Sequence, residues 1–179
     1  MRRPDLVPDC GRCAAICCVA TAFDASEDFA LDKPAGVACE NLTGCRCAIH
    51  DELAVRGFRG CAAYDCYGAG PAITRAFAGV PGTDRRRDVA FLVLRSLHEL
   101  LWLLTEAAKL CPTSHGELGA ELAAQIDAID AIASGPLPSL PAADLPRHDR
   151  ESRALLRRVG AALGGGRRAP RSLGVVRSG

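Results

Sequence analysis

The 179 residues carry 22 basic and 21 acidic side chains and suffice for one domain, or for one domain with a small appendage. The first ten residues contain no apolar run, which argues against a secretory signal peptide. The most apolar stretch, residues 89–104, is too short and too often charged to span a bilayer. We therefore expect a cytoplasmic protein without a membrane span, in a reducing compartment.

Nine of the ten cysteines lie between Cys10 and Cys66, in a segment with many glycines and few large apolar residues. Such a segment buries too little apolar surface to hold itself together and needs a staple. In a reducing compartment structural disulfides are rare, and clustered thiols more often bind metal or do redox work. The sequence therefore predicts a small, irregular, metal-stabilised module over residues 1–80.

The stretch "CGRCAAICC", residues 10–18, opens this module. If it is helical, the thiols of Cys10, Cys13 and Cys17 share one face, because helical neighbours recur every three and four residues. Cys18 then points away from that face. Three thiols could chelate one ion, while the fourth reaches a second ion or closes the site from another angle. Adjacent cysteines seldom bridge each other, so the pair favours ligands over a local disulfide.

The remaining cysteines of the segment follow in "CENL", "CRCAIH", "GFRGC" and "YDC". Thiolate ligands bring negative charge that nearby cations could offset. Four arginines beside these cysteines could donate to the sulfurs, although surface solvation is the simpler interpretation for each: Arg12, Arg46, Arg56 and Arg59.

The cysteines occur in the order C-x2-C-x3-C-C, C-x-x-L and C-x-I-H, followed by one cysteine after a Gly-Phe pair and another shortly after it. This order resembles that of the zinc- or iron-chelating cysteine-cluster family. Cys45 has no counterpart in the family pattern and is interpreted as an incidental thiol. His50 stands where the family has a tyrosine, a poor zinc ligand, and is interpreted as a packing residue. The resemblance implies eight metal ligands: Cys10, Cys13, Cys17, Cys18, Cys39, Cys47, Cys61 and Cys66.

Stretches such as "CCVATAF", "DFALDKPAG" and "LHELLWLL" are also similar to the N-terminal module of actinobacterial proteins labelled pentapeptide-repeat-containing. That resemblance covers roughly the first 110 residues. The repeats themselves need runs of A-(D/N)-L-x-x, whereas this chain has one "ADL" at residues 143–145 and no period. The chain is similar to a member whose repeat tail is truncated, diverged or frameshifted, so no function of that tail is implied.

Apolar periodicity predicts two helices after the module. The first spans residues 84–110, with Val89, Val93, Leu97, Leu100, Leu104 and Ala108 on one face. The second spans 115–133, with a capping box at Ser114 and Glu117 and a stripe of Leu118, Leu122, Ile126, Ile129 and Ala133. A three-residue link favours an antiparallel hairpin over 84–134.

Phe91 and Trp102 fall on the polar stripe of the first helix. They indicate either a second contact surface, for the module or a partner, or a helix buried on most sides. His98, His115 and His148 are interpreted as surface residues, and Cys111 as a packed thiol. A Pro-rich linker is predicted over 135–148, followed over 149–179 by a weak helix and a disordered basic tail.

The sequence thus predicts a mainly α fold with a Cys-rich module, a helical hairpin and a disordered tail. Its expected function is non-enzymatic metal binding, because four thiolates around zinc leave no open position for substrate. Zinc is favoured over iron or an iron–sulfur cluster; eight thiols suit two zinc sites, or one cluster with spare thiols. The alternatives are an iron–sulfur or thiol redox protein, and an interaction module that binds an unknown protein partner through Phe91 and Trp102. No feature indicates a specific nucleic acid.

Overall fold

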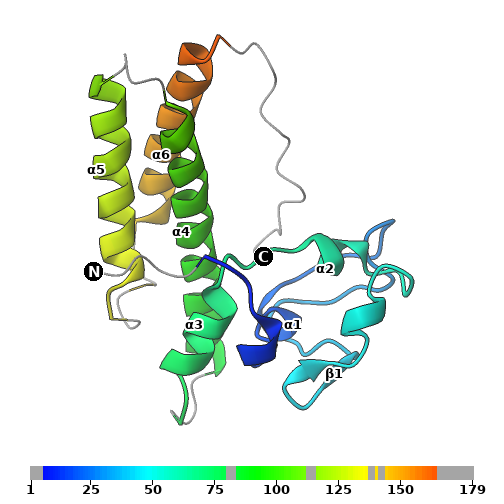
Figure 1. Cartoon of the computed structure of the whole chain (residues 1–179). Coiled ribbons are helices and arrows are strands. Elements are labelled where there is room, and N and C mark those ends of the chain that lie inside the picture. Colours follow the sequence, from blue (N-terminus) through cyan, green and yellow to red (C-terminus); the bar gives the residue numbers. More distant parts are fainter. Residues whose placement is uncertain (1–5, 80–83, 112–115, 137–139, 141–143, 165–179) are drawn as a thin grey trace.

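The computed structural model describes residues 6–79, 84–111, 116–136, 140 and 144–164. This part of the chain is mainly helical and combines a bundle of three long helices with a smaller irregular module, which confirms the predicted fold class (Figure 1). The elements in chain order are the 3₁₀ turn η1 (Cys10–Arg12), α1 (Cys17–Ala20), β1 (Leu42–Thr43), β2 (Arg46–Cys47), the 3₁₀ turn η2 (His50–Glu52), α2 (Arg59–Ala63), α3 (Ala69–Ala76), α4 (Asp84–Leu110), α5 (Gly116–Ala133) and α6 (Leu145–Ala162).

The two predicted helices are α4 and α5, and they run antiparallel as expected (Figure 1). Leu97, Leu100 and Leu104 of α4 are buried, as are Leu122 and Ile126 of α5. All five belong to one apolar core, so burial of these faces against each other stabilises the hairpin.

The predicted apolar face of α4 is wrong at its two ends, where Val89 and Ala108 are exposed. Phe91, which lies on the predicted polar stripe, and His98, a predicted surface residue, are both buried, with 0% and 1% of their surface accessible, so the surface interpretation of His98 is wrong. The reason is that α4 is covered on several sides, by α1 and α3 as well as by α5 and α6. A single helical stripe cannot describe a helix packed in that way.

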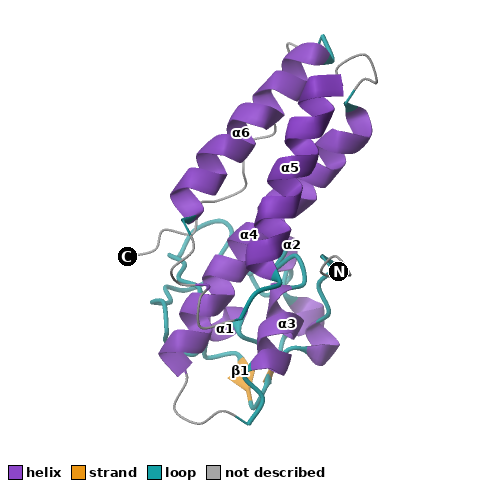
Figure 2. Cartoon of the chain, turned by 90° about the vertical axis from the view of Figure 1, so that its left-hand side faces the viewer, coloured by secondary structure: helices purple, strands orange, loops and turns teal. Residues whose placement is uncertain are grey.

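Helix α6 is the main addition to the predicted architecture. It begins at Leu145, inside the segment expected to be a Pro-rich linker, where the carboxylate of Asp144 accepts a hydrogen bond from the Arg147 N–H (3.1 Å). Pro146 lies in the first turn, where a helix tolerates proline because that N–H has no helical partner. Burial of Leu155 and Val159 against α4 and α5 makes α6 the third helix of the bundle (Figure 2).

His148 and Ser152 of α6 are also buried, so the interpretation of His148 as a surface residue is wrong. Both lie within hydrogen-bond distance of Gln125 on α5, at 3.5 Å and 3.3 Å. The predicted cap at Ser114, the residue His115 and the predicted disordered tail beyond residue 164 lie outside the described residues.

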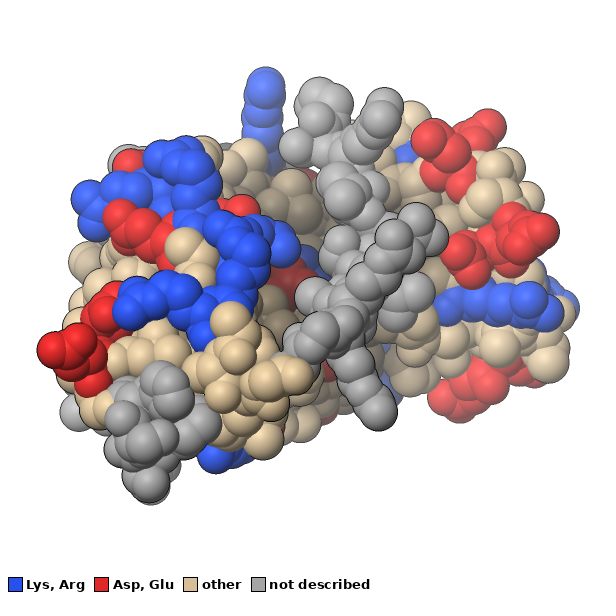
Figure 3. All heavy atoms as spheres, turned by 90° about the horizontal axis from the view of Figure 1, so that it is seen from above, with Lys and Arg blue, Asp and Glu red and all other residues tan. Residues whose placement is uncertain are grey.

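The charges on α6 are largely paired. Arg147 pairs with Glu151, Arg153 with Asp149, and Arg158 with Glu121 of α5. Seen along the bundle from above, basic side chains lie among acidic ones and do not form a field of one sign (Figure 3).

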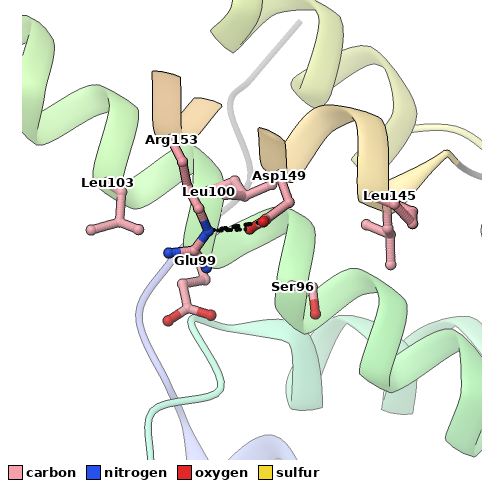
Figure 4. A pocket seen from close by; sticks show the side chains of 8 residues that line it. Ser96, Glu99, Leu100, Leu103, Leu145, Asp149 and Arg153 are labelled. Atoms are coloured by element: carbon pink, nitrogen blue, oxygen red, sulfur yellow. Dashed lines mark hydrogen bonds and ion pairs between the residues drawn. The ribbon is translucent and has the colours of Figure 1, made fainter. Parts of the chain in front are cut away.

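A shallow groove of about 320 Å³ lies between α4 and α6 (Figure 4). Leu100, Leu103 and Leu145 form its apolar part, and Arg153 donates to Asp149 at its edge (2.8 Å). No cysteine lines it. Among the described residues, no helix is long and apolar enough to cross a bilayer.

Candidate metal centre

The ten cysteines all lie in the described part of the chain, and none forms a disulfide. The adjacent pair Cys17 and Cys18 sits where the irregular module meets the helices, and six other cysteines lie in the segments around it: Cys10, Cys13, Cys39, Cys47, Cys61 and Cys66. Cys45 is exposed, and Cys111 is partly buried against the core of the bundle, which agrees with their interpretation as an incidental and a packed thiol.

Residues 10–18 do not form the continuous helix considered for them. Cys10–Arg12 form a 3₁₀ turn and α1 starts only at Cys17. Between them Ala15 adopts a left-handed conformation (φ 48°), which breaks the helical path. Even so, Cys10, Cys13 and Cys17 interact electrostatically with one another, so the three thiols lie near one another, as they would on one face of a helix.

Cys10, Cys13, Cys17 and Cys66 form what we call the first sulfur group. The sulfurs of Cys13 and Cys66 both border Gly70 in α3, where an added methyl group would lie 2.7 Å and 3.7 Å from them. The Ala14 N–H donates to Thr74 Oγ1 on the same helix (3.0 Å), so the turn that carries these thiols is docked on α3. Cys13, Cys17 and Cys66 also pack against the helical core.

Cys18, Cys39, Cys47 and Cys61 form the second sulfur group. The Cys39 N–H donates to the Cys18 carbonyl (2.8 Å), and the Cys18 and Cys47 thiols are hydrogen-bonded. The β1–β2 hairpin pairs Cys47 with Leu42 and so brings Cys47 back towards Cys39. Cys61 lies on α2 and interacts electrostatically with the other three thiols of the group.

The protonation of the adjacent pair is asymmetric. A hydrogen bond from the Cys17 thiol lowers the pKa of Cys18 to about 7, and the same bond, together with burial, raises the pKa of Cys17. Burial raises the pKa of Cys61 to about 11 and also raises the pKa values of Cys10 and Cys66. A metal that binds these thiols must therefore displace protons from most of them.

The buried cation beside the second sulfur group is Lys33, which the sequence reasoning missed. Only 4% of its surface is accessible, and its ammonium donates to the carbonyls of Val19 (3.1 Å), Pro34 (3.2 Å) and Val37 (2.9 Å). Its charge favours the thiolate form of Cys18. In the sequence, Lys33 stands beside proline and glycine residues, as exposed turn lysines commonly do. No sequence signal therefore predicted that it would be buried.

The four arginines proposed as sulfur donors are all exposed, and Arg12 is held by Asp9 (2.5 Å). This agrees with the solvation interpretation. His50 is also exposed and contacts Asp51 (3.1 Å between Nδ1 and Oδ1), so its interpretation as a packing residue is wrong. The reason is that its turn, η2, buries the preceding residue Ile49 instead.

Trp102 contacts the Cys-rich module, as expected if Phe91 and Trp102 mark a second contact surface on α4. Its ring lies 5.8 Å from that of Tyr67, just after Cys66. His98 donates from Nδ1 to the Tyr67 carbonyl (2.7 Å), and the Arg95 guanidinium lies 5.4 Å from the Tyr67 ring. Phe91 lies in the core and is not available for docking. The described structure thus ties α4 directly to the segment that carries Cys66.

The donor chemistry of the two sulfur groups fits a zinc or iron–sulfur centre, since thiolates are the preferred ligands of both. The geometry is not closed: among the described residues, no three Cys, His, Asp or Glu side chains converge on a point where they could hold an ion. Loading would therefore need thiol side chains of each group to turn towards a common centre.

The chain is similar to an uncharacterized protein of Bacillus subtilis (strain 168), YybG, with 41% identity over 110 residues. The alignment covers 58% of this chain and 39% of the relative, so it spans about two fifths of that protein. No protein-family model matches the sequence. No solved structure matches it either.

Proposed function

We propose that this chain is a non-enzymatic metal-binding protein in which cysteine thiolates hold a structural metal, zinc in preference to an iron–sulfur cluster. The observation that carries the proposal is that six thiols from a segment of 57 residues, Cys10 to Cys66, lie in the neighbourhood of the Cys17–Cys18 pair, eight thiols in all. The segment has little regular structure of its own, so a metal would supply the stability that burial does not.

From the order of the cysteines alone, we infer that the chain belongs to the cysteine-cluster family. Within that family, we infer that it is most similar to the N-terminal module of the pentapeptide-repeat-containing proteins. The proposal also places the protein in the cytoplasm, where thiols stay reduced. Zinc is preferred because no described residue demands redox chemistry. A set of four thiolates would close the metal to substrate, which makes the role structural.

The test is elemental analysis and a visible spectrum of the protein purified without oxygen. We expect bound zinc and a colourless protein; bound iron with absorption in the visible range would replace zinc by an iron–sulfur centre. Cys17→Ser should lower the metal content per chain, whereas Cys45→Ser and Cys111→Ser serve as controls and should leave it unchanged. If neither metal is present and all ten thiols titrate, the metal proposal fails and the thiol redox alternative replaces it.

A further inference from the structure

We infer that α4 carries a clamp that positions Cys66 beside Cys13, and that Arg95 is the central positioning residue of this clamp. The clamp consists of three side chains of α4 that contact residues 64–67: Arg95, His98 and Trp102. None of the three belongs to the proposed metal ligands. The inference deepens the proposed function, on which it rests only in taking Cys66 as a ligand of the metal.

The backbone directly after Cys66 adopts a conformation that side chains rarely tolerate. Tyr67 has a φ of 48° and Gly68 a φ of 76°, so two consecutive residues are left-handed. Such a conformation is unfavourable for a bulky residue and persists only where the surrounding structure holds it. The Tyr67 N–H donates to the Asp65 carboxylate (2.6 Å), a local bond that favours the turn but does not fix it relative to the bundle.

Cys13 has a strained neighbour as well. Among the described residues, Ala15 is the other non-glycine residue with a positive φ (48°), and it lies two positions after Cys13. The sulfurs of Cys13 and Cys66 border the same point of α3, since a methyl group added at Gly70 would lie 2.7 Å and 3.7 Å from them. The two strained positions therefore lie next to two sulfurs that meet at one place. Backbone strain is typical of segments that hold a ligand or a functional side chain.

Arg95 makes contacts on both sides of Cys66. Its guanidinium lies 5.5 Å from the centre of the Tyr64 ring and 5.4 Å from the centre of the Tyr67 ring. Its Nε also donates to the Asp65 carbonyl (3.3 Å). A planar guanidinium suits this place, because it stacks on aromatic rings and donates hydrogen bonds from its edge at the same time. Arg95 thus holds the residues before and after Cys66 on α4.

His98 and Trp102 complete the clamp. The side chain of His98 is buried, and its Nδ1 donates to the Tyr67 carbonyl (2.7 Å). The ring of Trp102 lies 5.8 Å from the Tyr67 ring. Positions 95, 98 and 102 follow one another at intervals of three and four residues, so they share one face of the helix. Because α4 packs against α5 and α6, this face is a firm base for the strained turn.

The test is the rate at which iodoacetamide alkylates Cys66 in reduced protein, followed peptide by peptide by mass spectrometry. Cys45, an exposed thiol of the same module, is the internal reference. Each protein is used as purified without oxygen, and its metal content is measured alongside. We expect Arg95→Leu to raise the rate of Cys66 relative to Cys45 about tenfold, which corresponds to about 1.4 kcal/mol, because two cation–π contacts and one hydrogen bond are lost together.

Arg158→Leu is the matched control for the Arg95 variant. Arg158 is an exposed arginine of α6 that pairs with Glu121 of α5. Its loss removes an ion pair of the bundle and leaves the three side chains of the clamp in place, so the ratio of the two rates should stay at the wild-type value. An equal rise in both variants would show general destabilisation and would overturn the inference. An unchanged Cys66 rate in Arg95→Leu would overturn it as well.

Tyr67 offers a pair of variants that separates its ring contacts from the turn itself. Tyr67→Phe keeps the ring and should react as wild type does. Tyr67→Asn removes the ring, although asparagine tolerates a left-handed backbone, and should raise the Cys66 rate as Arg95→Leu does. Trp102 is the only tryptophan, and its fluorescence should change in Tyr67→Asn and not in Tyr67→Phe. Wild-type rates in both variants would overturn the clamp. Absence of metal from the wild-type protein would instead overturn the proposed function and leave the comparison of alkylation rates valid.

Discussion

Lys33 is buried, although lysine side chains are usually exposed. A lysine with three backbone carbonyls as acceptors and almost no exposure has exchanged its hydration for fixed hydrogen bonds. Its ammonium also faces the ring of Phe23 at 5.6 Å. In this position it fastens helix α1, through Val19, to the turn at residues 34–37 and supplies positive charge beside the thiols of the second sulfur group.

We expect Lys33→Met to lower the free energy of unfolding by about 2 kcal/mol or more, because hydrogen bonds to a charged donor are each worth roughly 1.5–3 kcal/mol. Chemical denaturation followed by circular dichroism measures the change. Lys109→Met is the control: Lys109 is exposed and forms a surface pair with Glu106, so its loss should change stability by less than about 0.5 kcal/mol. Equal effects of the two substitutions would show that the buried ammonium contributes nothing.

His98 makes a second residue-scale prediction, on the pH dependence of stability. Burial lowers the pKa of His98 below its usual value, although the hydrogen bond to the Tyr67 carbonyl opposes this. The unfolded chain therefore binds this proton more readily than the folded chain. The contribution of His98 is fully present above the unfolded pKa of about 6.5 and is lost as the pH falls below it towards the lower folded value.

The measurement is the free energy of unfolding of wild-type protein and of His98→Gln at about pH 7.5 and pH 5.5. Wild type should lose more stability than the variant between these two values, since the variant lacks the titrating group. Metal-site and carboxylate contributions are common to both proteins and cancel in the comparison. The same loss in both would mean that His98 does not couple to folding.

At the scale of elements, α4 and α5 could be predicted from the sequence, α6 only in part, and the short elements of the module could not. Helix α4 has the bounds that periodicity and Pro112 indicated, and α5 ends at Ala133 as expected, with Gly116 as its first described residue. For α6 the sequence predicts only a weak helix after a Pro-rich linker, because three prolines precede the helix and Pro146 falls within the predicted linker, although proline fits a first helical turn. The apolar side of α6 is buried only because α6 packs on α4 and α5, and the sequence pattern of α6 alone does not show those contacts.

The hairpin gives the element-scale prediction. Leu104 has none of its surface accessible and packs in the core between the helices. Leu104→Ala should therefore lower the free energy of unfolding by about 2–5 kcal/mol, through lost burial and the cavity left behind. Leu110→Ala, at an exposed position of the same helix, should have an effect within about 0.5 kcal/mol. Denaturant titration distinguishes the two, and a Leu104→Ala effect as small as that of the control would contradict the packing.

At the scale of the whole molecule, the positions of the cysteines were predictable only in part. The sequence predicts three thiols of "CGRCAAICC" on one helical face with Cys18 directed elsewhere, but in the described structure Ala15 interrupts that helix and the thiols of Cys17 and Cys18 are hydrogen-bonded to each other. The assignment of Cys66 to the first three thiols could not be foreseen. It depends on α3 folding back beside η1, a contact between residues about 60 positions apart.

The division of the molecule into a Cys-rich module and a bundle of three long helices predicts how the protein responds to loss of metal. The module over residues 10–66 has short elements and relies on its thiols, whereas α4, α5 and α6 share an apolar core in which none of the eight proposed ligands is fully buried, although Cys13, Cys17 and Cys66 pack against it. Because metal affinity contributes directly to the folding free energy of the segment that holds the ligands, a chelator should unfold the module first. The three long helices should persist, since their packing needs no metal.

We expect a strong chelator, added to reduced protein, to expose residues 10–66 to proteolysis while most of the helical circular dichroism remains. The long helices comprise 27, 18 and 18 residues and dominate that signal, so it reports on the bundle. Zinc in excess over the chelator is the control and should restore protection of the module. Tyr67 adds a local reporter: its ring contacts Trp102, so Trp102 fluorescence should change as the segment after Cys66 loosens. Collapse of the helical signal together with the module would show that the bundle depends on the metal sites, through the packing of α1 and α3 on α4.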